Sequence, residues 1–219
     1  LRTGHFSPED SAFDIADWLD VNATYTYEPV YAKSLADEEA HAAPHFLLES
    51  QYEADIWDNT HQRLRSQIYE AALTGAQGSL YGHGAVWPFT DNWREALDAP
   101  GAMFHGHGRA YFESLPWWSL IPDIRTNGIV SDIGDESSPI VAAATPDRAH
   151  VVVYVPGARD VTVEMGGATG SVAVRWFDPA NGEYTAATSE LDDAGALTVT
   201  HPGENSDGDD DWVLDVRVT

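Results

Sequence analysis

Residues 44–89 have the sequence PHFLLESQYEADIWDNTHQRLRSQIYEAALTGAQGSLYGHGAVWPF, and this stretch decides the fold prediction. Its apolar run Phe46–Leu48 follows Pro44 and is too short for a helix, so it predicts a buried strand. Glu49 comes directly after that run. A carboxylate so close to a buried strand is costly to bury without a purpose, which makes Glu49 the first candidate for chemistry. The alternative is a glutamate held at the rim by a hydrogen-bond network.

A helix is predicted next, because apolar residues recur at helical spacing before Gly75, a residue suited to a helix C-terminus. Those apolar positions are Leu64, Ile68, Tyr69, Ala72 and Leu73. A second short strand is predicted over residues 79–86, and it leads to Trp87. Strand, helix and strand joined by short links predict a βαβ unit with parallel strands. Glu49 and Trp87 are therefore expected on the same rim, where β/α barrels carry out chemistry.

Three further elements are predicted before this stretch. A short helix is expected over residues 11–18, with Ser11 as its N-cap. A β-rich segment over residues 20–27 predicts a strand, and residues 29–43 predict a helix with Pro29 near its first turn. That helix is expected to expose an acidic face formed by Asp37, Glu38 and Glu39.

The pattern changes in the second part of the chain, after a Gly-, Ser- and Asp-rich segment at residues 124–138 that we interpret as a linker. Short strands separated by turn residues predict an antiparallel β-sandwich. The clearest hairpin signal is Asn181-Gly182, between WFDP and EYTAAT. The predicted strands cover residues 140–144, 150–155, 161–165, 171–178, 185–190, 196–200 and 212–218.

The composition is strongly acidic, with 36 acidic residues against 11 lysines and arginines and a formal net charge of −25. Lys33 is the one lysine. Dispersed acidic charge of this density indicates a protein adapted to high salt, which screens the repulsion. The same charge argues against nucleic acid as a partner, because phosphate contacts need basic patches. No run of about 18 apolar residues is present, so no membrane span is expected.

Several motifs resemble the apiosidase-like glycoside hydrolases, which pair a TIM barrel with a C-terminal β-sandwich. The barrel part of the resemblance rests on ESQYE at residues 49–53, on ALTGAQGSLYGHGAVWPF at residues 72–89, on PGA and on LPWWSLIPD. VVVYVPG, VRWFDPANGEY and DWVL are similar to the sandwich, a domain often labelled as the collagen-binding domain of a collagenase. The motifs extend over residues 5–216 in the family's order.

The resemblance implies three regions. Residues 1–123 would be the C-terminal half of a (β/α)8 TIM barrel, residues 124–138 a linker, and residues 139–219 an antiparallel β-sandwich. A complete barrel has eight β/α units and typically about 250 residues. The chain is therefore expected to start partway through a fold, and no signal-like apolar segment follows Leu1.

The resemblance also assigns site residues. Glu49 occupies the place of the family's nucleophile at the end of the seventh strand, and His5 that of a histidine ending the fifth. The family's acid/base aspartate ends the fourth strand and has no counterpart here. The remaining rim residues would contact substrate, and they are Tyr25, Tyr27, Glu28, Tyr52, Glu53, His83 and Trp87. Three alternatives stay open: Glu53 as a structural residue, His83 as a residue that only orders its loop, and Trp87 as a core tryptophan packed under Pro88.

No cofactor or metal is expected. His105 and His107 lie two residues apart in a predicted helix, so they do not share a face and do not suit a metal site. The acidic run at residues 205–211, NSDGDDD, is either a solvated turn or a calcium loop, because dense oxygens suit a hard cation. It lacks the twelve-residue EF-hand pattern.

Two functions from different classes remain. The first is a retaining glycoside hydrolase, or the C-terminal portion of one, that acts on carbohydrate only together with the missing barrel half. The second is a non-catalytic surface, assembly or glycan-binding protein that keeps the half-barrel and sandwich as a scaffold. A half-barrel exposes open sheet edges, so we expect an upstream barrel half or an oligomer partner. Polysaccharide hydrolysis would place the protein outside the cell or at its surface.

Overall fold

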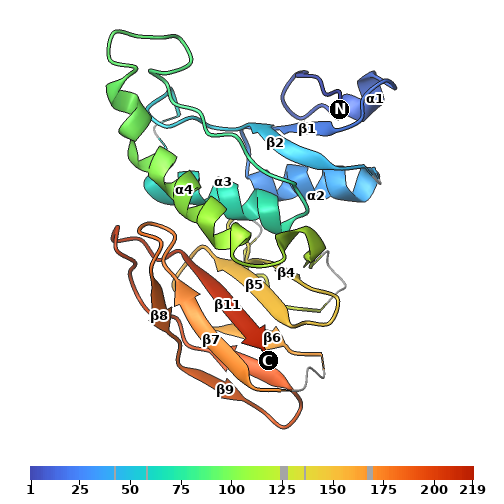
Figure 1. Cartoon of the computed structure of the whole chain (residues 1–219), viewed down its shortest axis with the longest axis vertical. Helices are drawn as coiled ribbons and strands as arrows, with labels where there is room; N and C mark the ends of the chain where they lie inside the picture. The colour runs from blue at the N-terminus through green and yellow to red at the C-terminus, as the bar shows by residue number, and fades with distance from the viewer. Residues whose placement is uncertain (42, 58, 124–127, 136, 167–169) are drawn as a thin grey trace. The chain divides into compact units, whose positions relative to one another are not determined.

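The computed structural model describes residues 1–41, 43–57, 59–123, 128–135, 137–166 and 170–219. The chain forms two compact units, residues 1–106 and residues 107–219, which we call the N-terminal unit and the C-terminal unit. Figure 1 shows both, coloured from the N-terminus to the C-terminus. Part of the expected linker, residues 124–127 and 136, lies outside the described residues.

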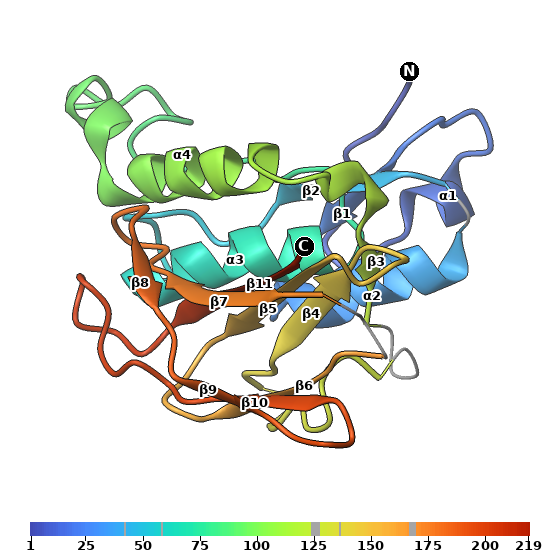
Figure 2. The same ribbon diagram turned by 60° about the horizontal axis from the view of Figure 1, so that its bottom comes forward.

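The N-terminal unit combines short helices with one pair of parallel strands (Figure 1). Helix α2 packs on both strands and on α3. In Figure 2, α2 and α3 lie along the same side of the β1–β2 pair. The elements are α1 (Ala12–Ile15), β1 (Asn22–Tyr25), α2 (Val30–Ala40), β2 (His45–Glu49), α3 (His61–Leu73) and the 3-10 helix η1 (Glu95–Asp98); α4 (Pro100–Glu113) crosses into the C-terminal unit.

The strand–helix part of the predicted βαβ unit is confirmed. Strand β2 ends at Glu49, and α3 begins after Thr60, whose side chain accepts a hydrogen bond from the Arg63 N–H. The helix ends before Gly75, which has a φ of 104° and so suits the left-handed position after a helix. Leu47 of β2, Val30 of α2 and Ala71 of α3 share one small core.

The second strand of that unit, predicted over residues 79–86, does not form. Two isolated parallel bridges, Leu47 to Ser79 and Glu53 to His83, replace it. The glycines give the reason. A Cβ on Gly82 would lie 2.2 Å from the Tyr52 ring, and one on Gly84 would lie 2.3 Å from the Ala54 carbonyl oxygen. These close approaches position a loop rather than a regular ladder.

Two predictions about the first helices are also wrong. Ser11 precedes α1, but its side chain makes no capping hydrogen bond, and the helix is only four residues long. Asp37 does not belong to an exposed acidic face, because it is 3% exposed. Its carboxylate accepts hydrogen bonds from Thr24 Oγ1, at 2.7 Å, and from Lys33 Nζ, at 2.5 Å. The single lysine therefore neutralises a buried carboxylate.

In its described residues, the C-terminal unit forms two antiparallel sheets. The larger has the order β3-β4-β5-β11-β7-β8, and the smaller has the order β6-β10-β9 (Figure 2). A 3-10 helix, η2 (Trp117–Ser119), precedes them. The strands are β3 (Ile121–Pro122), β4 (Val141–Ala144), β5 (His150–Val155), β6 (Val161–Glu164), β7 (Val172–Phe177), β8 (Tyr184–Ala186), β9 (Ser189–Leu191), β10 (Ala196–Val199) and β11 (Trp212–Val218).

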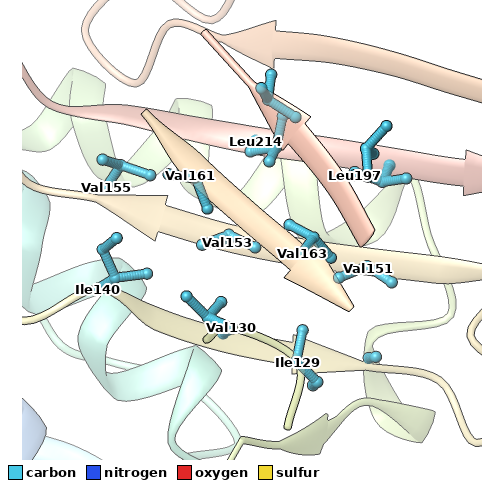
Figure 3. Close-up of a cluster of buried hydrophobic side chains, with 14 of the residues drawn as sticks. Ile129, Val130, Ile140, Val151, Val153, Val155, Val161, Val163, Leu197 and Leu214 are labelled. Atoms are coloured by element: carbon cyan, nitrogen blue, oxygen red, sulfur yellow. The ribbon is translucent and has the colours of Figure 1, made fainter. Parts of the chain in front are cut away.

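One apolar core joins the two sheets of this unit. Val151, Val153 and Val155 of β5 enter it together with Val163 of β6 and Leu197 of β10 (Figure 3). Trp176 of β7 is fully buried in the same core. All residues from Val151 to Val155 are fully buried, so β5 is covered on both faces. Burial of this kind supplies the main stabilising free energy of a sheet domain.

Most predicted strands of the C-terminal unit are confirmed within two residues at each end. The hairpin at Asn181-Gly182 is confirmed as well, because β7 pairs with β8 across it and Gly182 has a φ of 80°. The segment 185–190 was expected as one strand, but it contributes to β8 and β9, which belong to different sheets. In the described part of the chain, no helix has the length and apolar character needed to cross a membrane.

Candidate active site

Glu49 stands where the pairing of β1 and β2 becomes irregular. Thr24 pairs with Leu47, but the next residue, Tyr25, pairs with Glu49, so Leu48 is an extra residue in β2. A bulge of this kind re-aims side chains and is common beside active sites. Here it places Glu49 directly beside Tyr25 at the carboxyl ends of both strands.

Three side chains hold the Glu49 carboxylate, which is only 14% exposed. His5 Nε2 lies 2.9 Å from Oε2, and the Tyr27 hydroxyl donates to Oε1 at 2.9 Å. The Tyr52 side chain lies close enough to interact with the same carboxylate. These three contacts fix the direction of the carboxylate.

Aromatic side chains surround this carboxylate. The Tyr25 and Tyr27 hydroxyls lie 2.6 Å apart, so the tyrosines form a chain that ends on Glu49. The His5 ring contacts Tyr25 edge-on, with centroids 4.8 Å apart, and the Trp57 ring stacks on Tyr27 at 5.0 Å. Rings in this arrangement offer faces on which the C–H surface of a sugar can stack.

The environment keeps the tyrosines protonated. Burial raises the pKa of Tyr27 far above its usual value, with further contributions from Tyr25 and Glu49. Burial, reinforced by Glu49, also raises the pKa of Tyr52 to about 12. Both hydroxyls therefore keep their protons, and Tyr27 donates its proton to the Glu49 carboxylate.

Glu53 forms a second polar centre one loop away from Glu49. The hydroxyl of Tyr81 donates to Glu53 Oε2, and the backbone N–H of Gly101 donates to the same oxygen at 2.9 Å. Gly101 lies in the first turn of α4, so the carboxylate satisfies a free N–H and complements the positive end of the helix. A structural role for Glu53 is thus visible in its contacts.

An open hollow of about 240 Å³ lies next to this centre. Its lining contains His83, which is buried, and Trp87, which is 64% exposed. The interpretation of Trp87 as a core residue is therefore wrong. The full lining is Tyr52, Tyr81, Gly82, His83, Val86, Trp87, Ala96, Leu97 and Ala102.

The structure brings four of the proposed site residues, His5, Tyr25, Tyr27 and Tyr52, around Glu49, and it places Glu53, His83 and Trp87 around or beside the hollow. Glu28 has an exposed side chain, and its backbone carbonyl accepts from the Arg63 guanidinium at 2.7 Å.

Sequence reasoning missed Trp57, Tyr81 and Leu97, which lie in loops or in η1 without strand or helix periodicity. The one available signal was the high density of aromatic residues in 52–57 and 81–93.

Two segments are rich in histidine or in acidic residues, the residue types that bind metal ions. The ring of His105 lies beside that of Tyr81, and burial lowers the pKa of His105 to about 4. In the 205–211 loop, the Asn205 side chain accepts from the N–H groups of Asp207 and Asp209 and donates to Asp211. Among the described residues, no group of three or more His, Cys, Asp or Glu side chains is arranged to hold a metal ion.

The family described as "Apiosidase-like, catalytic domain" matches residues 1–119, which is more than half of the chain. The chain belongs to the apiosidase-like family. Residues 121–217 match a second family, described as "Putative collagen-binding domain of a collagenase". The site around Glu49 lies within the first of these matches. No curated protein matches the sequence.

Two solved structures share this fold. One is described as a glycoside hydrolase, with a TM-score of 0.83 and 19% sequence identity over 99% of this chain and 57% of its own. The other is described as a glycoside hydrolase family 5 from Bacteroides vulgatus ATCC 8482, with a TM-score of 0.76 and 18% identity over 94% of this chain and 52% of its own. This chain thus spans little more than half the length of either relative.

Proposed function

We propose that this chain carries the nucleophile of a retaining glycoside hydrolase and acts on carbohydrate together with a further part of the barrel. Residues 1–123 would be the C-terminal half of a (β/α)8 barrel, and residues 139–219 a β-sandwich. The observation that carries the proposal is Glu49, held by Tyr27 and His5 beside Tyr52 at the carboxyl end of a parallel strand. Membership of the apiosidase-like family supports it.

Glu49 would attack the anomeric carbon of the sugar and form a covalent glycosyl-enzyme intermediate, which water then hydrolyses. Attack requires a carboxylate oxygen whose lone pair points at the anomeric carbon. His5 and Tyr52 would fix the carboxylate, and Tyr27 would hold the oxygen that does not attack. Because the tyrosines keep their protons, they would act as donors toward Glu49 and would not act as bases.

The proton donor to the leaving oxygen would come from a second carboxyl group, about 5–5.5 Å from the nucleophile in retaining enzymes. None of the described groups that hold Glu49 is a carboxylic acid. The Glu53 carboxylate is occupied by Tyr81 and the start of α4. We therefore assign the proton donor to a barrel segment beyond these 219 residues, in keeping with the share of the structural relatives that this chain covers.

Substrate contacts would come from the rings around Glu49 and from the hollow. Tyr25 and Trp57 would stack on or border the sugar at Glu49. His83 and Trp87 would contact the part of the substrate that extends past Tyr52. Glu28, with its exposed side chain, would reach an outer part of the substrate. A polysaccharide substrate would place the protein outside the cell.

The test compares this chain with a longer protein that restores the rest of the barrel, using aryl glycosides and plant or microbial polysaccharides. We expect sugar release from the longer protein only, and loss of release in Glu49→Gln, because an amide is not nucleophilic. In Glu49→Ala, added azide should restore turnover of an activated aryl glycoside by occupying the vacated space. The azide product should have the anomeric configuration opposite to that of the substrate.

Three results would overturn this proposal. One is full activity in Glu49→Gln, and another is hydrolysis by the 219-residue chain alone. The third is glycan binding by a longer protein that has no hydrolytic activity, which would favour the scaffold or glycan-binding alternative. Glu113→Gln is the matched control, because this exposed glutamate ends α4 and pairs with Arg109 at the surface.

A further inference from the structure

We propose that Gln51 is a positioning residue that holds the Tyr27 hydroxyl against the Glu49 carboxylate, with Gln67 of α3 as its anchor. The inference rests on the proposed function, because it names what keeps the nucleophile in one orientation. The Gln51 side chain contacts the backbone of Tyr27, so Gln51 would act on the reaction through Tyr27.

Tyr27 lies beyond the end of the strand pair that carries the site. Strand β1 ends at Tyr25, and the Thr26 N–H then donates to the Glu49 carbonyl oxygen at 3.1 Å. Residues 27 and 28 form a bend outside the strand. A side chain on such a segment is placed less precisely than one on a strand, unless further contacts hold its backbone.

Gln51 supplies such a contact. Its side-chain Nε2 donates to the Tyr27 carbonyl oxygen at 2.5 Å. The Tyr27 hydroxyl in turn donates to Glu49 Oε1 at 2.9 Å. Gln51 follows Glu49 by two residues, so one short segment carries both the carboxylate and the donor that holds its tyrosine partner. The backbone and the ring of Tyr27 are therefore both tied to residues 49–51.

Helix α3 anchors this arrangement from the side. Gln67 of α3 is 5% exposed, and its Nε2 donates to the Gln51 carbonyl oxygen at 3.1 Å. Arg63 lies four residues earlier on the same face of the helix, and its guanidinium donates to the Glu28 carbonyl oxygen at 2.7 Å. One helix thus holds the segments that follow β1 and β2, and with them the relative positions of Tyr27 and Glu49.

An amide suits the position of Gln51 because it donates without carrying a charge. A lysine or arginine there could pair with the Glu49 carboxylate in place of Tyr27. A glutamate can only accept when it is ionised, so it would leave the Tyr27 carbonyl oxygen without its donor. Methionine has nearly the length of glutamine and no donor, so Gln51→Met removes the hydrogen bond while it fills a similar space.

The first test measures hydrolysis of an activated aryl glycoside by the longer protein. Gln51→Met should lower kcat by about threefold to tenfold, because one hydrogen bond that orients Tyr27 is lost, and it should leave KM within about twofold. In the Tyr27→Phe background, adding Gln51→Met should lower kcat by less than about twofold, because the hydroxyl that Gln51 orients is already absent.

Gln77→Met is the matched control for this test. Gln77 is exposed, and its Nε2 also donates to a backbone carbonyl oxygen, that of Gly75, at 3.1 Å. Its own N–H bonds the carbonyl oxygen of His45, at the opposite end of β2 from Glu49. Gln77→Met should therefore remove the same kind of bond and leave kcat unchanged.

The second test needs no hydrolysis. The 219-residue chain is labelled with 3-fluorotyrosine and observed by fluorine NMR, and the Tyr27 resonance is the one that Tyr27→Phe removes. Glu49→Ala should shift this resonance, because the hydroxyl loses its acceptor. Gln51→Met should shift it in the same direction, because it separates the hydroxyl from the carboxylate. Gln77→Met should leave it in place.

Three results would each contradict the role of Gln51. They are an unshifted Tyr27 resonance in Gln51→Met, an unchanged kcat in Gln51→Met, and an equal loss of kcat from Gln51→Met with and without the Tyr27 hydroxyl. The last would show that Gln51 acts on the structure as a whole. Full activity in Glu49→Gln would instead overturn the proposed function, and the fluorine spectra would still show whether Gln51 positions Tyr27.

Discussion

The two units bury different kinds of side chain. The core of the C-terminal unit is made of apolar side chains, most of them from the two sheets. The N-terminal unit instead buries many polar groups around its two strands, among them Asn22, Thr24, Thr26, Asp37, His45, Arg65 and Glu70. Apolar burial stabilises without directional partners, whereas each buried polar group needs a partner in the right place. The C-terminal unit has fewer such groups, and its fully buried Asp215 is paired with Arg175 and Arg217. The unit with the candidate nucleophile therefore depends on more pairings of this kind than its neighbour does.

The largest effect is expected in the apolar core. Trp176→Ala removes a fully buried ring and its hydrogen bond to the Thr200 carbonyl oxygen, so the free energy of unfolding should fall by about 3–5 kcal/mol. Leu191→Ala is the control, because Leu191 lies in β9 and is 53% exposed. Urea titrations followed by circular dichroism measure the free energy of unfolding of both variants. Equal losses in the two variants would show that the core does not set the stability of this unit.

Removing a single charge should lower the free energy of unfolding of the N-terminal unit by almost as much. Lys33→Met leaves the buried Asp37 carboxylate without its cation and should cost about 3–5 kcal/mol in a urea titration. Arg109→Met breaks a pair with the same four-residue spacing on the surface of α4, and it should cost at most about 1 kcal/mol. Adding Asp37→Leu to Lys33→Met should recover much of the loss. If it does not, the buried pair is not the source of the effect.

The activity of the candidate site should fall when one tyrosine hydroxyl beside Glu49 is removed. Tyr27→Phe removes a donor to the Glu49 carboxylate, a hydrogen bond to a charged group that is worth about 1.5–3 kcal/mol. In the longer protein we expect kcat/KM for an aryl glycoside to fall by about tenfold to a hundredfold. Tyr25→Phe, one step further along the chain of hydroxyls, should have a smaller effect. An equal loss in both, or none in Tyr27→Phe, would contradict the assigned role of Tyr27.

The same contrast explains how much of the fold could be predicted. Strands of the C-terminal unit alternate with turn residues, and their hairpins join segments close in sequence, as at Asn181-Gly182. Local pattern was therefore sufficient for most of them. The exception is β9, which follows β8 after two residues but pairs with β10 in the other sheet. A change of sheet depends on packing and leaves no local signal.

Prediction was less successful in the N-terminal unit, because its buried polar pairs resemble surface residues in the sequence. Asp37 sits in the run ADEEA and was expected in solvent. Its burial depends on Thr24 and on Lys33, and only the fold brings Thr24 into contact. The position of Glu49 after an apolar run was informative, but its partners His5 and Tyr27 come from distant segments. The resemblance to a family identified them, and periodicity alone did not.

The smallest effect is a pH dependence confined to the N-terminal unit. His45 begins β2 and is buried, with Nε2 2.9 Å from Ser34 Oγ and Nδ1 3.5 Å from the Glu38 carboxylate. Burial lowers the pKa of His45, Lys33 lowers it further, and Asp37 opposes them. The unfolded chain therefore takes up the His45 proton at a higher pH than the folded chain does. Stability from this group is complete above about pH 6.5 and declines as the pH falls below it.

His45→Gln keeps an amide that can bond Ser34 but does not titrate. Melting temperatures measured from about pH 7.5 to about 5.5 should therefore fall more for the natural sequence than for the variant. The Glu38 pKa is raised by burial, so its protonation acts in the opposite sense, and Glu38→Gln should steepen the decline of the natural sequence. Parallel curves for the natural sequence and His45→Gln would show that His45 is hydrated in solution. The polar interior of the N-terminal unit would then be open to water at the start of β2, unlike the apolar core of the C-terminal unit.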